Sequence, residues 1–211
     1  MNMSLLNKLF NFVILTTKRY NIDDSHGVSH SMKVLHFASG IYQDERYKNS
    51  SLEKYERVIY ISSILHDMCD KKYMNEKEGI DKIEEFLQEN ISKEEIDITN
   101  KIVSTMSYSK VKINGFPDLQ EYQLAYHIVR EADLLCGFDF DRAMIYNMYK
   151  MDGNIDTAFT DAENLFNNRV FKHNDDGLFI TDYSKKQSLI LQTQALNQIN
   201  IWKKLLKNPI L

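Results

Sequence analysis

The sequence predicts an all-α protein. Apolar residues recur at helical spacing through most of the chain, and alternating strand-like runs are rare. The 211 residues include only 7 Gly and 2 Pro, which is few for a fold that must make many tight turns. A chain of this length fills one domain, so we expect a single helical bundle over residues 1–211.

Five helices are expected in the first half of the chain. The opening helix lies within residues 1–21, and its longest purely apolar run, Phe12–Leu15, is far shorter than the roughly 20 residues that span a bilayer. Further helices are expected over about 28–44, 52–68 and 75–90. The helix over 52–68 is apolar on nearly every side at its end, which predicts a central position. Ser92, with Glu95 three residues later, is typical of a capping box that opens the fifth helix.

The second half begins at a loop, because NGFPD at 114–118 combines the residues that favour turns. Helical patterns then cover about 119–136, 141–151, 156–171 and 181–206, separated by DGN and NDDG turns. No repeat, linker or low-complexity segment divides them.

The composition excludes several classes of protein. The chain has 26 basic and 30 acidic residues and a formal charge of −4, without a basic, aromatic-interleaved stretch, so a nucleic-acid polymer is not an expected partner. Cys69 and Cys136 form no CxxC motif, which fits a reducing compartment. The N-terminal segment has no small-residue cleavage site, so we expect a cytoplasmic protein without a membrane contact.

Three polar clusters interrupt the apolar scaffold: DDSHGVSH at 23–30, LHDMCDKKY at 65–73 and READLLCG at 130–137. Each cluster places His or Asp beside a buried helix segment. Buried ionisable groups are costly unless a cation or a partner charge compensates them. The three clusters therefore supply the candidate site residues.

Each candidate also has an ordinary structural explanation when it is taken alone. His66 and Asp67 could mark a helix end that turns to water. His26 and His30, four residues apart, could share a helix face, lie on the surface or bond a backbone carbonyl, and Asp133 could pair with Arg130.

Taken together, the clusters resemble the HD-domain phosphohydrolase superfamily. The similarity is closest to small bacterial-type HD hydrolases, which read D-x-S-H-D-x-x-H, then L-H-D-x-x-D-x-K-[FY], then [DE]-A-D-x-L. In this chain the matching residues are Asp23, Ser25, His26 and His30; Leu65, His66, Asp67, Asp70, Lys72 and Tyr73; and Glu131, Ala132, Asp133 and Leu135. NLFNNRVFK weakly resembles the family's late H-F-x-x-K-L segment, so the similarity covers about residues 20–205.

The resemblance implies an HD-domain bundle with its metal-site core at about 20–140, completed by C-terminal helices at about 141–206. It implies that His30, His66, Asp67 and Asp133 bind one divalent metal ion. Two imidazoles and two carboxylates suit Mn, Mg, Co, Ni, Fe or Zn, and open coordination positions are typical of a catalytic site. A bound metal of this kind activates water and neutralises charge on a phosphoryl group.

Catalytic roles are also implied for residues beside the metal ligands, with Asp67 itself counted in the catalytic group. Lys72 is expected to hold phosphate oxygens, and Asp70 to orient or deprotonate the attacking water. A solvated loop is the alternative for both residues, because DKKYMNEKE is charged throughout. His26 is an acid, a phosphate contact or an orienting residue, and Arg169 and Lys172 are reserve basic groups.

The chain departs from the family pattern at several positions outside the metal ligands. Gly27 stands where Asp is frequent, Lys33 where Arg is frequent, and Leu165 where His is common. The R-L-D continuation is replaced by Leu134, Leu135 and Cys136. These changes leave the expected hydrolysis intact and put the substrate in doubt.

The expected function is therefore hydrolysis of a small phosphorylated substrate, a nucleotide by resemblance. Cleavage of a nucleoside triphosphate to monophosphate and pyrophosphate is favoured. A nucleotide phosphomonoesterase and a non-catalytic sensory module that binds metal and ligand are the alternatives. A cyclic-dinucleotide phosphodiesterase is disfavoured because its GYP signature is missing. The apolar N-terminal helix allows a homodimer.

Overall fold

A computed structural model describes residues 3–150 and 152–208 of the chain. Within these ranges it contains ten α-helices, several short 3-10 turns and no β-strand, so the expected all-α fold is confirmed. The α-helices are α1 Leu5–Tyr20, α2 Val28–Arg46, α3 Glu56–Leu65, α4 Glu76–Gln88, α5 Lys93–Thr105, α6 Tyr108–Asn114, α7 Gln123–Cys136, α8 Phe140–Lys150, α9 Ile155–Asn168 and α10 Asp182–Leu206. The 3-10 turns are η1 Asp24–His26, η2 Ser50–Tyr55, η3 Gln120–Tyr122 and η4 Val170–Lys172.

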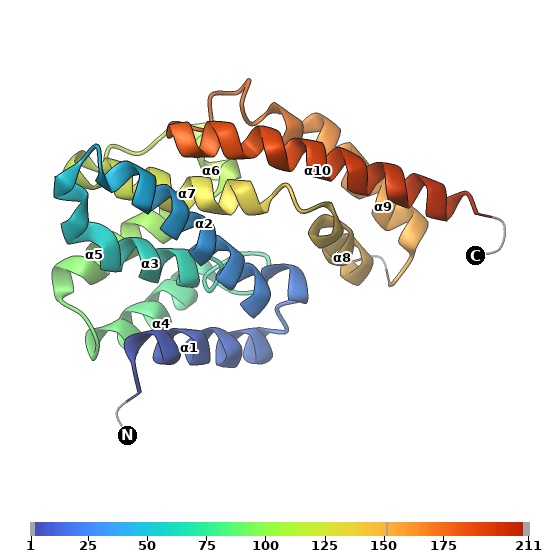
Figure 1. Ribbon diagram of the computed structural model, residues 1–211. Helices are drawn as coiled ribbons and strands as arrows, with labels where there is room; N and C mark the ends of the chain where they lie inside the picture. Colours follow the sequence, from blue (N-terminus) through green and yellow to red (C-terminus); the bar gives the residue numbers. More distant parts are fainter. Residues whose placement is uncertain (1–2, 151, 209–211) are drawn as a thin grey trace.

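Helix α3 is central, as its sequence predicts, because it contributes to both hydrophobic clusters among the described residues. Val58 and Ile59 pack with α2, α7 and the C-terminal helices, whereas Ile61 and Ile64 pack with α1, α4 and α5. Figure 1 shows α1 to α5 gathered at one end of the molecule, with α8 and α9 at the other end and α10 running along both. The faces of α3 therefore join the two halves of the core.

Most helix boundaries follow local signals in the sequence. The Ser92 hydroxyl accepts a hydrogen bond from the Glu95 amide while the Glu95 carboxylate accepts one from the Ser92 amide, which confirms the capping box. Thr181 caps α10 through its side chain, and Gly115, with φ of 73°, ends α6 at the expected loop.

Two expected helices differ from the observed ones near the site. The helix expected over 52–68 is interrupted: residues 50–55 form a 3-10 turn, and α3 ends at Leu65, so His66 lies just outside it. The helix expected over 156–171 ends at Asn168, where Arg169 adopts a non-helical conformation before η4. Met151, the expected end of the preceding helix, lies outside the described residues.

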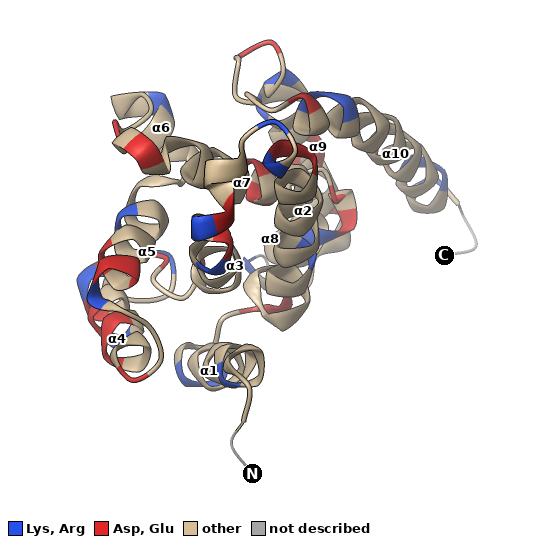
Figure 2. Ribbon diagram, turned by 60° about the vertical axis from the view of Figure 1, so that its left-hand side comes forward, with Lys and Arg blue, Asp and Glu red and all other residues tan. Residues whose placement is uncertain are grey.

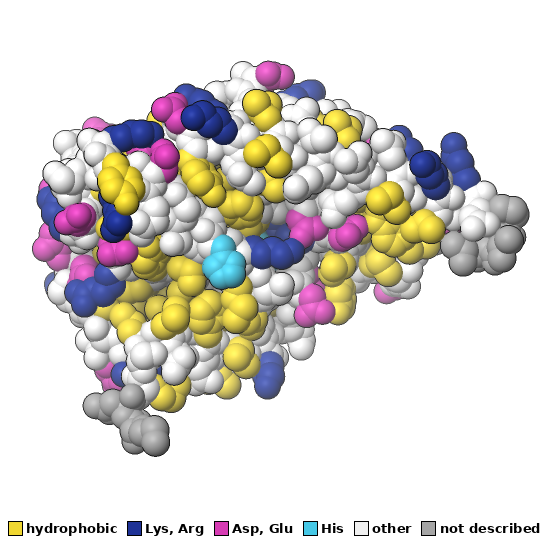
Figure 3. All heavy atoms as spheres, viewed as in Figure 1, with side chains coloured by type: hydrophobic (Ala, Val, Ile, Leu, Met, Phe, Trp, Pro, Cys, Tyr) yellow, Lys and Arg dark blue, Asp and Glu magenta, His cyan; other side chains and the backbone are white. Residues whose placement is uncertain are grey.

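The surface carries charges of both signs on the same helices. Figure 2 shows Lys and Arg interspersed with Asp and Glu on α4 and α5, and in Figure 3 apolar side chains lie among charged ones on the face in view. None of the described helices is both long and apolar enough to cross a membrane.

Candidate metal centre and its cavity

His30 is buried in the first turn of α2. The turn η1 places His26 before the helix, and Gly27 occupies the N-cap position, so His26 and His30 do not share one continuous helix. The His30 side chain is 1% exposed, and its Nε2 atom points to the end of α3. The backbone turn at Gly27 thus separates the two histidines of one motif, with His26 in η1 and His30 in α2.

The end of α3 positions the His–Asp pair. His66 Nδ1 lies 2.9 Å from the Ser63 carbonyl oxygen, so Nδ1 carries the proton and donates it, and Nε2 presents a lone pair. Asp67 follows in the turn after the helix. The side chains of His66 and Asp67 are 3% and 13% exposed, which excludes the explanation that this helix end turns to water.

Asp133 comes from the last full turn of α7. Its expected alternative partner, Arg130, instead donates to the Leu178 carbonyl and lies near Glu131, at 3.6 Å. The Asp133 carboxylate is consequently available to the two histidines.

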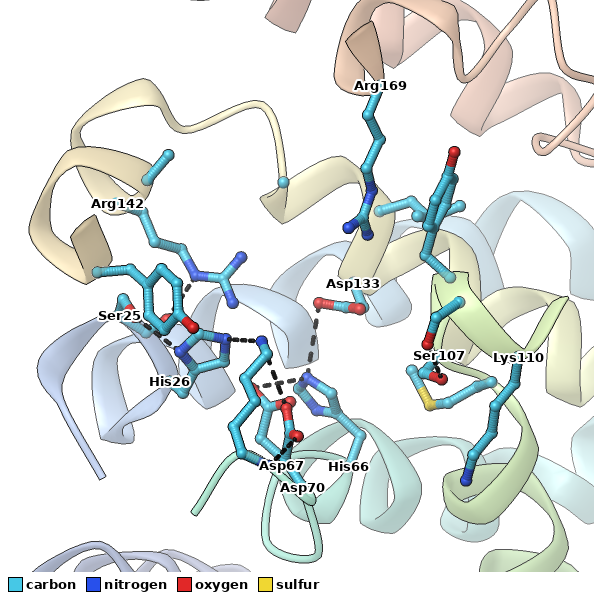
Figure 4. A pocket seen from close by; sticks show the side chains of 18 of the residues that line it. Ser25, His26, His66, Asp67, Asp70, Ser107, Lys110, Asp133, Arg142 and Arg169 are labelled. Atoms are coloured by element: carbon cyan, nitrogen blue, oxygen red, sulfur yellow. Dashed lines mark hydrogen bonds and ion pairs between the residues drawn. The ribbon is translucent and has the colours of Figure 1, made fainter. Parts of the chain in front are cut away.

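Four ligand-type side chains converge at this point, and Figure 4 shows His66, Asp67 and Asp133 among them. His30 Nε2 lies 3.1 Å from His66 Nε2, 3.2 Å from Asp67 Oδ2 and 3.3 Å from Asp133 Oδ1. His66 Nε2 lies 3.3 Å from Asp67 Oδ2 and 3.6 Å from Asp133 Oδ1. Helices α2, α3 and α7, which pack on one another, bring the four residues together.

The electrostatics of the cluster couple the imidazoles to the carboxylates. Burial disfavours the charged form of His66, but Asp67 and Asp133 outweigh burial and raise its pKa well above the ordinary value. Burial would likewise raise the pKa of Asp67 and of Asp133, yet the neighbouring histidines hold both pKa values well below the ordinary range. The arrangement strongly favours a positive charge between two carboxylates.

The donor set fits a metal cation. His30, His66 and Asp133 offer ligand atoms that all lie within 4.8 Å of one another, so these three residues could hold a metal ion. Two imidazole nitrogens lie within 3.3 Å of the buried Asp67 Oδ2 atom. Two imidazoles and two carboxylates this close together favour a shared positive charge, which a metal cation supplies, or a proton on His66 in the metal-free protein.

His26 belongs to a second network beside the metal ligands. The hydroxyls of Ser25 and Tyr73 both donate to the Asp23 carboxylate, so their oxygens are free to accept from His26 Nδ1, at 2.7 and 3.0 Å. His26 Nε2 is then the unprotonated nitrogen, and it accepts from Lys72 Nζ at 3.1 Å. Asp23, Ser25 and Tyr73 therefore fix the tautomer of His26 and direct its Nε2 atom at Lys72.

Lys72 is held on two sides. Its Nζ atom lies 3.5 Å from Asp70 Oδ2, in addition to the contact with His26, and its backbone amide donates to Asp70 Oδ1 at 2.9 Å. Lys72 Nζ also lies 5.2 Å from the centre of the Tyr146 ring. The Lys72 side chain is 45% exposed, so it remains open to solvent while it contacts these groups at the cavity.

Metal ligands and basic groups line one cavity of about 360 Å³. Its walls include His26, His66, Asp67, Asp70, Lys72 and Asp133. Arg142 and Arg169 also line it, and Figure 4 shows them reaching toward the centre from different sides. The expected site residues other than His30 and the reserve candidate Lys172 thus border a single space, and His30 contacts His66, Asp67 and Asp133 among them.

Sequence reasoning missed Arg142 and three aromatic residues. Arg142 donates through Nε to the Ser25 carbonyl, and its Nη2 lies 3.2 Å from His30 Nε2. An arginine near the start of an amphipathic helix is usually solvated, so the sequence carries no signal for this contact. The cavity-lining Tyr108, Tyr146 and His173 likewise follow no motif.

The departures from the family pattern have local explanations. Lys33 pairs with Asp139, and Leu165 lines the cavity with its side chain partly exposed. Cys136 is buried, and burial raises the pKa of its thiol, so it is not a reactive cysteine. None of these positions contributes to the metal cluster.

Comparison with known proteins supports the fold. One solved structure, of a protein from Lactobacillus plantarum that was a structural genomics target, superimposes with a TM-score of 0.68. The alignment covers 94% of this chain and 95% of the other at 18% sequence identity. No known protein family and no curated protein matches the chain. The likeness therefore concerns the helical fold alone.

Proposed function

We propose that the protein is a metal-dependent phosphohydrolase of the HD type. The convergence of His30, His66, Asp67 and Asp133 carries this proposal, because the Nε2 atoms of two buried histidines lie within about 3.6 Å of each other and of both carboxylates at the wall of a cavity. The motif resemblance supports the same assignment.

His30, His66, Asp67 and Asp133 are the proposed ligands of one divalent ion. When bound, such an ion supplies Lewis-acid activation of water and neutralises charge that develops on the phosphoryl oxygens. The Ser63 carbonyl keeps His66 in the tautomer that offers Nε2.

The residues beside the ligands have complementary roles. Lys72 Nζ, presented to the cavity by His26 and Asp70, binds a phosphoryl oxygen. Asp70 Oδ2 accepts a proton from the attacking water. The hydrogen bond that the Lys72 backbone amide donates to Asp70 Oδ1 fixes the orientation of this carboxylate. His26 is proposed as a positioning residue, because its Nε2 atom accepts from Lys72 and its Nδ1 atom is engaged by hydroxyls.

A nucleotide is the proposed substrate, and cleavage of a nucleoside triphosphate to monophosphate and pyrophosphate is the proposed reaction. The volume of about 360 Å³ lies in the range of small-molecule sites. The basic groups at the rim suit an anionic ligand.

The test is a panel of nucleoside mono-, di- and triphosphates incubated with Mn²⁺, Co²⁺, Ni²⁺ or Mg²⁺, with phosphate and pyrophosphate release followed separately. Asp67→Ala removes a proposed ligand, and Asp44→Ala is the matched control because Asp44 lies on the exposed end of α2 and pairs with Lys48. Pyrophosphate release that Asp67→Ala abolishes and Asp44→Ala preserves supports the proposal. Wild-type release no greater than that of Asp67→Ala on every substrate refutes it.

A further inference from the structure

Arg169 has an unusual environment for an arginine. Its guanidinium lies over the Tyr108 ring, with Cζ 3.7 Å from the ring centre. Among the described residues no carboxylate forms an ion pair with it, and no side chain or carbonyl accepts a hydrogen bond from its guanidinium. Burial of the group lowers its pKa. A half-buried cation with five unused donors is costly to keep unless it binds an anion.

The chain geometry aims this arginine at the cavity. Arg169 lies where α9 ends and η4 begins, with φ of −136° and ψ of −62°, so its side chain leaves the axis of α9. Figure 4 shows it extending from above toward Asp133. Arg142 and Lys72 lie on another side of the metal cluster, next to His26. The cavity therefore has basic groups in two separate places.

His173 provides a second observation at the same place. Its side chain is 1% exposed, it lines the cavity, and neither of its ring nitrogens has a hydrogen-bond partner. Burial and then the positive charge of Arg169 lower its pKa to about 3, so the ring is neutral at physiological pH and offers one N–H donor. Its ring centre lies 5.7 Å from that of Tyr108. An unpartnered buried donor beside an unpaired guanidinium is typical of a built anion site.

We infer that Arg169, supported by the Tyr108 ring and assisted by His173, forms a second anion subsite that binds a phosphate group other than the one at the metal cluster. This inference rests on the proposed function and makes it narrower: the substrate carries at least two linked phosphate groups. Arg142 and Lys72 serve the phosphate nearer the metal. Arg169 is then a specificity-determining residue that separates di- and triphosphates from monophosphates.

Binding of two non-hydrolysable probes tests the inference without relying on turnover. Methylenediphosphonate carries two linked phosphonates and methylphosphonate carries one. Isothermal titration calorimetry compares the two probes in a Mn²⁺ buffer and again in an EDTA buffer. All variants are measured in the same buffers, so chelation of Mn²⁺ by the probe is the same for every variant. The variants are Arg169→Gln and, as a matched control, Lys172→Gln, which removes the same charge from an exposed side chain three residues away.

We expect Arg169→Gln to weaken methylenediphosphonate binding about tenfold or more and to leave methylphosphonate binding within about twofold, because a charge-assisted hydrogen bond is lost at one subsite only. Lys172→Gln should leave both unchanged. Tyr108→Phe keeps the ring face and should bind like the wild type, whereas Tyr108→Leu should resemble Arg169→Gln. Unchanged methylenediphosphonate binding by a folded Arg169→Gln variant, or equal losses for both probes or for Lys172→Gln, overturns the inference.

The outcomes of the two proposals are distinguishable. Selective loss of diphosphonate binding in a protein that hydrolyses no nucleotide supports the subsite and refutes the hydrolase. If Asp67→Ala abolishes hydrolysis but Arg169→Gln does not change diphosphonate binding, the hydrolase is supported and the second subsite is refuted. Melting temperatures of all variants establish that they are folded before binding is compared.

Discussion

Metal binding should stabilise the protein more at higher pH. His66 lies between the Asp67 and Asp133 carboxylates, and although burial disfavours its charged form, these carboxylates raise its pKa well above 6.5. At pH 6 to 7 the metal-free ring is therefore protonated, whereas a ligand must offer a free nitrogen, so metal binding releases a proton. The pKa values of both carboxylates are lowered, so they remain ionised and release none.

The sign follows from proton linkage. A raised histidine pKa stabilises the metal-free fold below the ordinary value of 6.5, and this contribution is lost as pH rises through the raised pKa. The metal-bound fold gains stability relative to the metal-free fold over the same pH range. Metal binding releases one proton, so the apparent dissociation constant of the metal falls about tenfold per pH unit, which corresponds to about 1.4 kcal/mol. Metal at about 100 times that constant adds roughly 2.7 kcal/mol. At about 2–4 °C per kcal/mol, the increase in Tm caused by metal should grow by about 3–6 °C per pH unit.

Thermal denaturation followed by circular dichroism, with excess Mn²⁺ or with EDTA at about pH 6 and about pH 7, measures this difference. His66→Gln should abolish the metal-induced increase, whereas His36→Gln, at an exposed position of α2, should keep both the increase and its pH dependence. An increase in Tm that is equal at both pH values, or larger at the lower one, would refute the assignment of His66 as a ligand.

Three further predictions concern single side chains. Gly79→Ala should destabilise the protein by about 1–3 kcal/mol in urea unfolding, because the new Cβ would lie 2.6 Å from the Cys69 Cα atom. Glu131→Ala should cost about 3 kcal/mol in the same assay, because this buried carboxylate accepts two backbone amides and a hydroxyl before α10. Tyr73→Phe should lower kcat about tenfold while the protein keeps its Tm, because the hydroxyl orients His26.

Matched substitutions separate these causes from general effects. Gly27→Ala should be tolerated, since its new Cβ would have no neighbour closer than 3.5 Å. Glu131→Gln keeps one acceptor oxygen and should lose less stability than the alanine variant. Tyr149→Phe, at a side chain that is 63% exposed, should leave kcat unchanged. A control that behaves like its test variant would contradict the corresponding explanation.

Local sequence signals predicted most of the helices, but not α6 over Tyr108–Asn114. The capping box at Ser92 and the side-chain cap at Thr181 act within one helical turn, so they are readable without the fold. The expected helix over 52–68 was wrong at both ends, because its apolar pattern continues beyond the residues that are α-helical.

The sequence by itself determined that this is an all-α chain and that His30, His66, Asp67 and Asp133 are unusual polar residues in buried helix segments. Only the tertiary structure decided which side chains meet. Arg142 contacts His30 across 112 residues of chain, and His26 contacts Lys72 across 46. Helical periodicity specifies which face of a helix is buried, but it contains no information on the partner helix or on the side from which a long basic side chain enters the cavity. The packing of the helices supplied that information, and it placed beside the site both Arg169, a reserve candidate in the sequence, and His173, which no local motif assigns to it.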